Sequence, residues 1–230
     1  MQKLFTTLLL ISLSFTGFSQ METEEELKYK FLTNVPITIN PEAYQITGSA
    51  YENDNFAMGK VYKNGQVVAT NVALRYNALR DEFEVKPNLD TPDASAKVMM
   101  RHPDIYVKIL NKVFVYADPK NNEDRPGYYL VLFEGDNADL YKKISKEFIE
   151  GMEATTSLTR DIPSSYKDKT AFYLLNKNTN IFQEFPNSRN AKFGLFKDKK
   201  KELKKYAKEN RLNINKQTAL LKLVKYYNTL

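Results

Sequence analysis

The dipeptide Asn64-Gly65 constrains the fold of this chain more than any other feature, because it joins two short apolar runs. Val61-Tyr62 precedes it and Val67-Val68 follows it. Asn and Gly both tolerate the positive φ angles that tight hairpin turns require. The sequence therefore predicts two antiparallel strands here.

Further short runs rich in β-branched and aromatic residues follow this hairpin, separated by turn residues. They cover residues 72–76, 83–85, 98–101, 113–116 and 128–133. Residues 136–150 fit two structures, a helix with Leu140, Ile144 and Phe148 on one face or a strand returning from a turn at 135–137. We expect residues 46–150 to form a β-rich domain with an antiparallel meander or roll.

The C-terminal third of the chain changes from strands to helices. Residues 171–175 and 181–185 predict a second hairpin. Asp198 and Asn215 are expected to cap two helices, and Asn210 to end the first. The last helix gathers its apolar residues on one face: Leu220, Leu223, Val224 and Tyr227. With residues 151–165 as a Thr/Ser/Pro-rich linker and 166–230 as a hairpin and basic helical unit, the fold class is α+β.

The N-terminus has the pattern of an export signal. Lys3 precedes an apolar run at residues 4–15, and the small residues Gly17 and Ser19 precede Gln20, so we expect a signal peptide at 1–19. The run is shorter than the ~20 residues that span a bilayer. Residues 20–45 are expected to form an extended arm. We expect an exported protein, in the periplasm rather than at the cell surface or outside it.

Positive charge is concentrated at the C-terminal end. The whole chain has 34 basic and 28 acidic residues, whereas residues 192–230 have 12 basic and 3 acidic ones. A contact with an anionic surface is predicted for six lysines: Lys197, Lys200, Lys201, Lys204, Lys205 and Lys208. Spacings of three and four residues place most of them near one helix face. A solvated helix face is the competing interpretation.

Sequence motifs for catalysis or metal binding are weak. His102 is the only histidine and there is no cysteine, which excludes zinc sites built from several such ligands. His102 precedes a proline, as expected of a loop residue, and no Gly-x-Ser-x-Gly elbow occurs. No Gly-rich phosphate loop occurs either, so no cofactor is predicted and no catalytic residue is assigned.

Two sets of carboxylates remain to be weighed. Glu82 and Glu84 would share one strand face, and glycoside hydrolysis needs only two carboxylates; a solvated face opposite Phe83 and Val85 is the preferred interpretation. The acidic clusters around Asp54 and Asp136 lack the alternating spacing and closing Glu of a calcium loop. They fit turns that Asn and Asp side chains stabilise. Tyr76, in Arg75-Tyr76-Asn77, is expected to pack rather than to bind a sugar or base.

Several of these segments resemble a group of small exported proteins of Bacteroidota that have no assigned activity. The resemblance rests on residues 48–51, 59–62, 72–77 and 81–85, and on Lys225-Tyr226-Tyr227-Asn228 near the end. It implies a location in a Gram-negative envelope and supplies no catalytic residue. A short turn of that family near residue 135 favours the strand at 136–150.

The sequence thus favours an exported binding or scaffolding protein without enzymatic activity. Its expected partner is an anionic lipid, lipopolysaccharide or an acidic protein; no nucleic acid partner is expected, nor a membrane-spanning segment in the mature chain. The alternative is a carboxylate-dependent hydrolase of envelope or extracellular polymers. A cleft with two carboxylates would favour the hydrolase, and a flat basic surface the binding protein.

Overall fold

The computed structural model describes residues 33–36, 46–117, 126–156 and 160–230. The predicted signal peptide at 1–19 lies outside the described residues, and of the predicted arm at 20–45 only residues 33–36 are described. The elements in chain order are β1 (Thr33–Pro36), β2 (Ala57–Lys63), β3 (Gln66–Asn77), β4 (Glu82–Lys86), η2 (Asp93–Ser95), β5 (Lys97–Met99), β6 (Ile105–Ile109), β7 (Lys112–Ala117), β8 (Gly127–Phe133), β9 (Ala138–Ile149), β10 (Ser165–Asn176), β11 (Ile181–Glu184), α2 (Arg189–Gly194), η3 (Lys197–Lys199), α3 (Lys200–Glu209) and α4 (Gln217–Tyr227).

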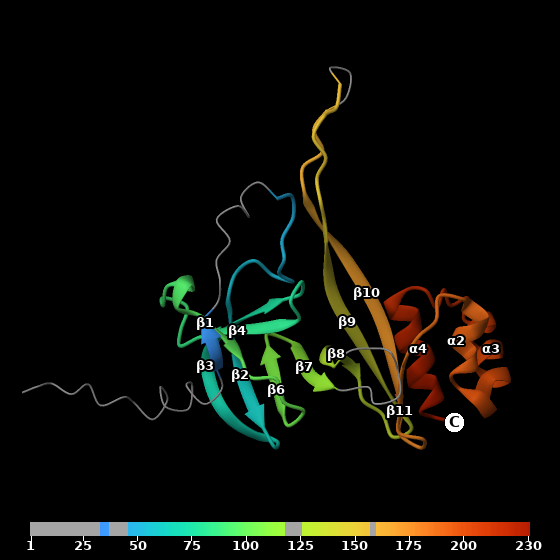
Figure 1. Cartoon of the computed structure of the whole chain (residues 1–230). Coiled ribbons are helices and arrows are strands. Elements are labelled where there is room, and N and C mark those ends of the chain that lie inside the picture. Colours follow the sequence, from blue (N-terminus) through green and yellow to red (C-terminus); the bar gives the residue numbers. More distant parts are fainter. Residues whose placement is uncertain (1–32, 37–45, 118–125, 157–159) are drawn as a thin grey trace, which may run out of the picture.

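The described strands form one antiparallel sheet in the order β1-β5-β4-β3-β2-β6-β7-β8-β9-β10-β11. The chain runs outward from β2 to β5, returns to the other side of β2 as β6, and then continues as a meander to β11. Strands and helices are segregated along the chain, so the α+β class is confirmed. Figure 1 shows strands β1 to β8 on one side and the helices gathered beside β9 to β11.

The β2–β3 hairpin turns at Asn64-Gly65, as the sequence predicts. Asn64 and Gly65 have φ angles of 51° and 76°, in the region that Asn and Gly adopt most readily. Gly59 on β2 has a different role. A Cβ there would lie 2.7 Å from the carbonyl oxygen of Lys108 on β6, so its small size lets β6 approach β2 closely.

Aromatic side chains from several strands fill the core inside the β2–β8 part of the sheet. Tyr76 is 3% exposed and its ring lies 5.0 Å from Phe83 and 5.3 Å from Phe114. Tyr128 of β8 packs edge-on against Phe83 at 4.9 Å. These contacts join strands that are distant in the sheet order, which requires the sheet to curve. The expectation that Tyr76 packs is confirmed.

A second core lies between the end of the sheet and the helices. Leu140 of β9 and Leu174 of β10 are fully buried in the same cluster as Leu203 of α3 and Leu223 of α4. The apolar face predicted for the last helix is therefore confirmed, since Leu220, Leu223, Val224 and Tyr227 are all buried.

Strands β9 and β10 form a long hairpin that projects beyond the rest of the sheet (Figure 1). They pair from Ala138↔Asn176 to Ile149↔Ser165, so residues 136–150 contain a strand and not a helix. The predicted linker at 151–165 connects two neighbouring strands of one sheet. The two cores meet at β8 and β9 instead, since Leu132 packs against both and Ile144 of β9 packs against the first.

Three local predictions are wrong in detail. Strand β6 was not predicted, although Ile105, Val107 and Ile109 alternate with polar residues and are buried. Asn215 does not cap α4, whose N-cap is Lys216. The Asn215 side chain instead accepts a hydrogen bond from Lys192 at 2.6 Å. Asp198 does not cap α3 either, because the N-cap of this helix is Lys199, whereas Asn210 does end it.

Candidate functional site

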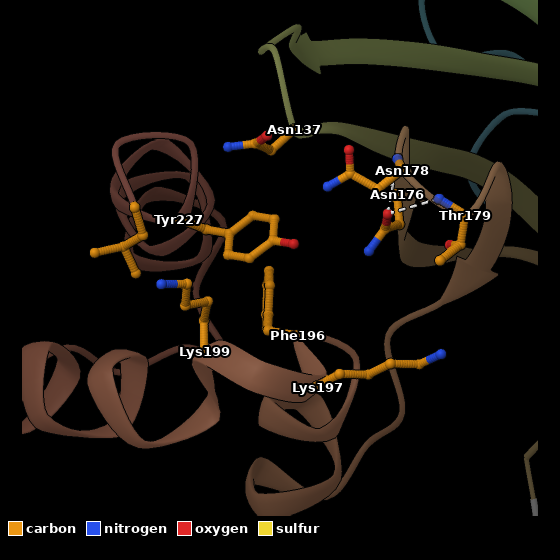
Figure 2. Close-up of a pocket in the computed structure, with 9 residues that line it drawn as sticks. Asn137, Asn176, Asn178, Thr179, Phe196, Lys197, Lys199 and Tyr227 are labelled. Atoms are coloured by element: carbon orange, nitrogen blue, oxygen red, sulfur yellow. Dashed lines mark hydrogen bonds between the residues drawn. The ribbon is translucent and has the colours of Figure 1, made fainter.

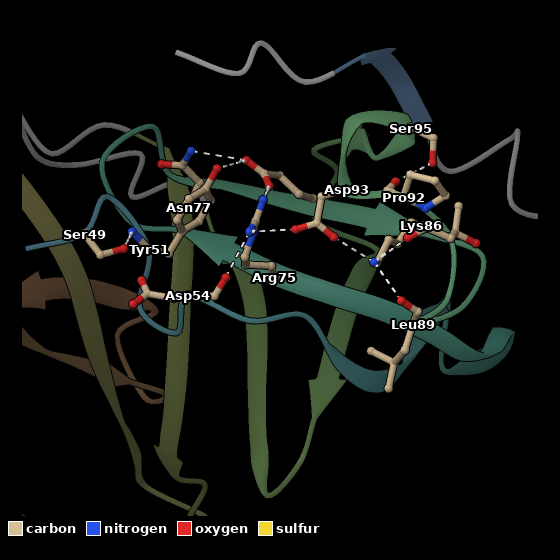
Figure 3. A network of polar contacts seen from close by, with 12 residues as sticks. Ser49, Tyr51, Asp54, Arg75, Asn77, Lys86, Leu89, Pro92, Asp93 and Ser95 are labelled. Atoms are coloured by element: carbon tan, nitrogen blue, oxygen red, sulfur yellow. Dashed lines mark hydrogen bonds and ion pairs between the residues drawn. The ribbon is translucent and has the colours of Figure 1, made fainter. Parts of the chain in front are cut away.

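A buried polar network involves the carboxylate that sequence reasoning considered for catalysis (Figure 3). Arg75 donates to Glu84 through Nε at 3.1 Å and Nη2 at 2.7 Å. Its guanidinium lies over the rings of Tyr51 and Phe56, 3.9 and 4.2 Å from their centroids. The Tyr51 hydroxyl donates to Glu84 at 3.1 Å; burial, and then the negative charge of Glu84, raise the pKa of Tyr51 to about 12.

The same network extends to a second buried cation on β4. The Lys86 ammonium donates to the carbonyl oxygens of Leu89 at 3.0 Å and Thr91 at 2.6 Å, and to the Asp93 carboxylate at 2.8 Å. Asp93 also lies 3.5 Å from Arg75. The loop after β4 therefore closes over two cations, and every fully buried side-chain polar atom of the described residues has a partner.

This geometry corrects the interpretation of Glu82 and Glu84 as a solvated face. Glu84 is 3% exposed, whereas Glu82 bonds to Arg101 at 3.0 Å nearer the surface. Residues 49–56 and 88–95 cover the outer side of β3 and β4, which local alternation could not reveal. Since Glu84 is buried and ion-paired, it fits a structural role better than acid–base chemistry.

The other acidic and histidine candidates also have local partners. His102 lies in a loop, and its Nδ1 accepts from the Asp104 N–H at 3.2 Å. Asp139 is buried, accepts from the Gly135 N–H at 2.9 Å and pairs with Lys177 at 3.1 Å. Over the ranges that the structure describes, no three acidic or histidine side chains are placed to hold a metal ion.

Helix α3 carries the basic surface predicted from the sequence. Leu203 and Ala207 are buried against the rest of the molecule. At ~100° per residue, the exposed side of α3 holds a run of four lysines that extends from the outward direction to one flank, with the exposed Glu202 and Glu209 beside it. We call the four lysines Lys201, Lys204, Lys205 and Lys208 the α3 lysine face. Its only ion pair within the described residues is a weak one, Lys205–Glu209 at 3.9 Å.

Lys197 does not belong to the α3 lysine face. Its φ of 30° interrupts the helical path, because a helix requires negative φ throughout. It lies in the short turn η3 before α3 and lines a different pocket from Lys208. Lys200 is exposed at the first position of α3, at the edge of the face.

A basic pocket adjoins the α3 lysine face. Its volume is about 360 Å³, and Lys208 lines it together with Arg189 and Arg211. The residues that line it include no carboxylate side chain. None of the three cations forms an ion pair with a described residue. Sequence reasoning missed Arg189 and Arg211 because α2 brings Arg189 to the α3–α4 turn only in the folded chain.

Two side chains hold these helices in place. Asn228 bonds through Oδ1 to the N–H groups of Asn137 and Ala138 at 2.7 and 3.0 Å, and through Nδ2 to the Ala138 carbonyl at 3.0 Å. It thereby attaches the end of α4 to the β8–β9 turn. The Lys192 ammonium, whose pKa burial lowers, binds the α3–α4 turn through Asn215. The basic surface is thus presented by anchored helices.

Comparisons with protein-family models, curated proteins and solved structures found no match for this chain. In the described part of the chain, no helix combines the length and the apolar character needed to cross a bilayer.

Proposed function

We propose that this is an exported, non-enzymatic binding protein of the bacterial envelope, and that its helical end contacts an anionic, phosphate-bearing lipid surface. The observation that carries the proposal is the α3 lysine face, four exposed lysines on one helix with a single weak ion pair among the described residues. Export and the periplasmic address are proposed from the signal pattern at residues 1–19.

The electrostatics of the face favour a flat anionic partner. Lysines three and four residues apart repel each other, and this repulsion is relieved when the face lies on negative charge. Each lysine near an anionic membrane contributes about 1 kcal/mol. The adjoining pocket of Arg189, Lys208 and Arg211 offers room for a phosphate group between the three cations.

The hydrolase alternative has less support. Glu84, the carboxylate that suited it best, is held by Arg75, Tyr51 and Asn77 beneath a covering segment. A catalytic acid needs access to substrate, and this position lacks it. An acidic protein partner remains the second binding candidate, since it offers the same charge.

The test is sedimentation with vesicles of phosphatidylglycerol and phosphatidylcholine across a salt series. Mature protein should bind phosphatidylglycerol vesicles at low salt and lose most of this binding as salt rises, because screening shortens to about 8 Å at physiological ionic strength. It should not bind pure phosphatidylcholine. Absence of binding to phosphatidylglycerol at low salt would refute the lipid surface and leave the acidic protein.

A further inference from the structure

A polar pocket lies at the end of the sheet where the β8–β9 and β10–β11 turns meet α4 and η3 (Figure 2). Its volume is about 290 Å³, at the low end of the ~300–1,000 Å³ typical of small-molecule sites. It has room for one small molecule. It is separate from the basic pocket beside α3, with which it shares no lining residue.

Two polar groups of this pocket bond to no described residue and are open to the pocket, because every fully buried side-chain polar atom in the described part of the chain has a partner. Tyr227 and Asn176 are each 8% exposed and line the cavity. Figure 2 shows the Tyr227 hydroxyl directed into the space between α4 and the β10–β11 turn. No described residue bonds to this hydroxyl. Asn176 uses its Oδ1 for the N–H groups of Asn178 and Thr179 at 3.0 and 3.1 Å, whereas its Nδ2 donates to no described residue.

Such groups take a partner from outside the chain, either water or a bound molecule. Polar groups that line a pocket and are not used by the fold are available to orient a ligand. The Oδ1 of Asn176 has a structural role, because it stabilises the turn at residues 176–179. The turn does not use the Asn176 Nδ2 or the Tyr227 hydroxyl. A molecule in the pocket with its own hydroxyl groups would satisfy both.

The remaining walls define the chemistry of that molecule. Asn137, Asn178 and Thr179 add side-chain amides and a hydroxyl, which both donate and accept hydrogen bonds. This suits a ligand with several neighbouring hydroxyl groups. Lys197 and Lys199 supply positive charge, and the lining contains no acidic side chain. An anionic substituent would therefore be favoured.

We propose that this pocket binds a single anionic sugar unit, with Tyr227 and Asn176 bonding to sugar hydroxyls and Lys197 and Lys199 facing the anionic group. The ring of Phe196, fully buried at 4.9 Å from that of Tyr227, supports the Tyr227 ring from below. This site is independent of the α3 lysine face.

The experiment is an NMR titration of the mature protein with D-glucuronate, D-glucose, glucose 6-phosphate and inorganic phosphate, following the side-chain amide signals of Asn176. The glucuronate should shift these signals and bind at least about tenfold more tightly than glucose. Equal binding of glucose would refute the anionic preference. If phosphate alone binds as tightly as glucose 6-phosphate, the pocket does not recognise a sugar and the proposal fails.

The variants separate this pocket from its surroundings. Tyr227→Phe removes only a hydroxyl without a protein partner, so the fold should persist while glucuronate binding falls about three- to tenfold, as expected for one hydrogen bond. The matched control is Tyr226→Phe, on the neighbouring ring that stacks on Tyr206 at 3.9 Å. Equal effects of the two variants, or none of either, would overturn the assignment.

Charge variants complete the test. Lys197→Gln with Lys199→Gln should reduce glucuronate binding at least about fivefold, since both residues line the pocket and flexible ammonium groups bind anions. Changing the α3 lysine face to Gln should leave glucuronate binding unchanged. Loss of glucuronate binding in the latter variant would show that the sugar binds elsewhere. Vesicle binding by Tyr227→Phe should equal that of the wild type, which keeps the two proposals distinguishable.

Discussion

Glu82 and Glu84 stand two positions apart on β4 but lie in different environments. The side chain of Glu84 is 4% exposed and that of its partner Arg75 is 9% exposed, whereas Glu82 and Arg101 are 22% and 41% exposed. Breaking a buried ion pair from one side leaves an uncompensated charge and typically costs 3–5 kcal/mol, about the whole margin of a small domain. An exposed pair contributes about 0–1 kcal/mol.

Glu84→Gln is therefore expected to destabilise the protein by about 3 kcal/mol, because the Arg75 charge loses its closer anion and keeps only Asp93 at 3.5 Å. The matched control Glu82→Gln should cost less than about 1 kcal/mol. Urea unfolding of both variants measures the difference. Equal midpoints for the two variants would contradict the structural role of Glu84.

Several tyrosine hydroxyls are shielded strongly enough to make stability depend on alkaline pH. Burial is the main cause of a raised pKa at each of four residues: Tyr51, Tyr76, Tyr128 and Tyr141. An unfolded tyrosine loses its proton near pH 10, whereas the folded protein holds these protons to higher pH. Their contribution is thus fully present below about pH 10 and is lost as pH rises above it.

The expected result is a urea midpoint that falls steadily above pH 10, with the tyrosinate absorption of these four residues appearing together with unfolding. Tyr51→Phe should make this fall less steep, because its own pKa of about 12 no longer contributes. The pKa of Lys143 is lowered, chiefly by burial. Lys143 therefore loses its proton in the folded state before it does so in the unfolded state, which makes stability rise with pH, but only up to about pH 10.4. A midpoint independent of pH above 10 would contradict this account.

At the scale of elements, the β9–β10 hairpin replaces the expected linker. Residues 151–164 connect its two strands at the projecting end, where Met152 and Ile162 pair in a single bridge. Residue composition alone could not distinguish a linker from such a connection, since both are polar and rich in turns.

Brief proteolysis is expected to cut first within residues 151–164, because the described residues 152–156 and 160–163 are exposed. The nicked protein should still elute as one species in gel filtration, since β9 and β10 pair along their full length. Separation of the fragments without denaturant would show that the two cores are independent domains. A fully resistant chain would show that the connection is more ordered than proposed.

Local signals explain which elements the sequence predicted. The turn at Asn64-Gly65 depends on only two adjacent residues, which have the required positive φ angles. Its hairpin could therefore be predicted. The apolar face of α4 depends only on helical spacing and was also predicted. The burial of Glu84 and the pocket around Tyr227 arise from segments that meet only in the folded chain, so no local pattern indicates them.

At the scale of the whole molecule, the structure separates a β-rich core from a helical end whose net positive charge exceeds that of the whole chain. Residues 192–230 carry 12 basic and 3 acidic side chains, and α3 presents four of the lysines together. Binding to an anionic surface is therefore expected to depend on the position of these charges, not only on their number. Net charge alone would attract the protein weakly to any anionic surface.

The most direct test compares two variants of equal charge in phosphatidylglycerol vesicle sedimentation at low salt. One changes the α3 lysine face to Gln, and the other changes four exposed lysines elsewhere: Lys60, Lys63, Lys108 and Lys167. The account predicts that the first variant binds at least about tenfold more weakly than wild type, given about 1 kcal/mol per lysine at the membrane, and that the second binds nearly as wild type. Equal loss in both variants would show that net charge, not the α3 lysine face, attracts the protein to the surface.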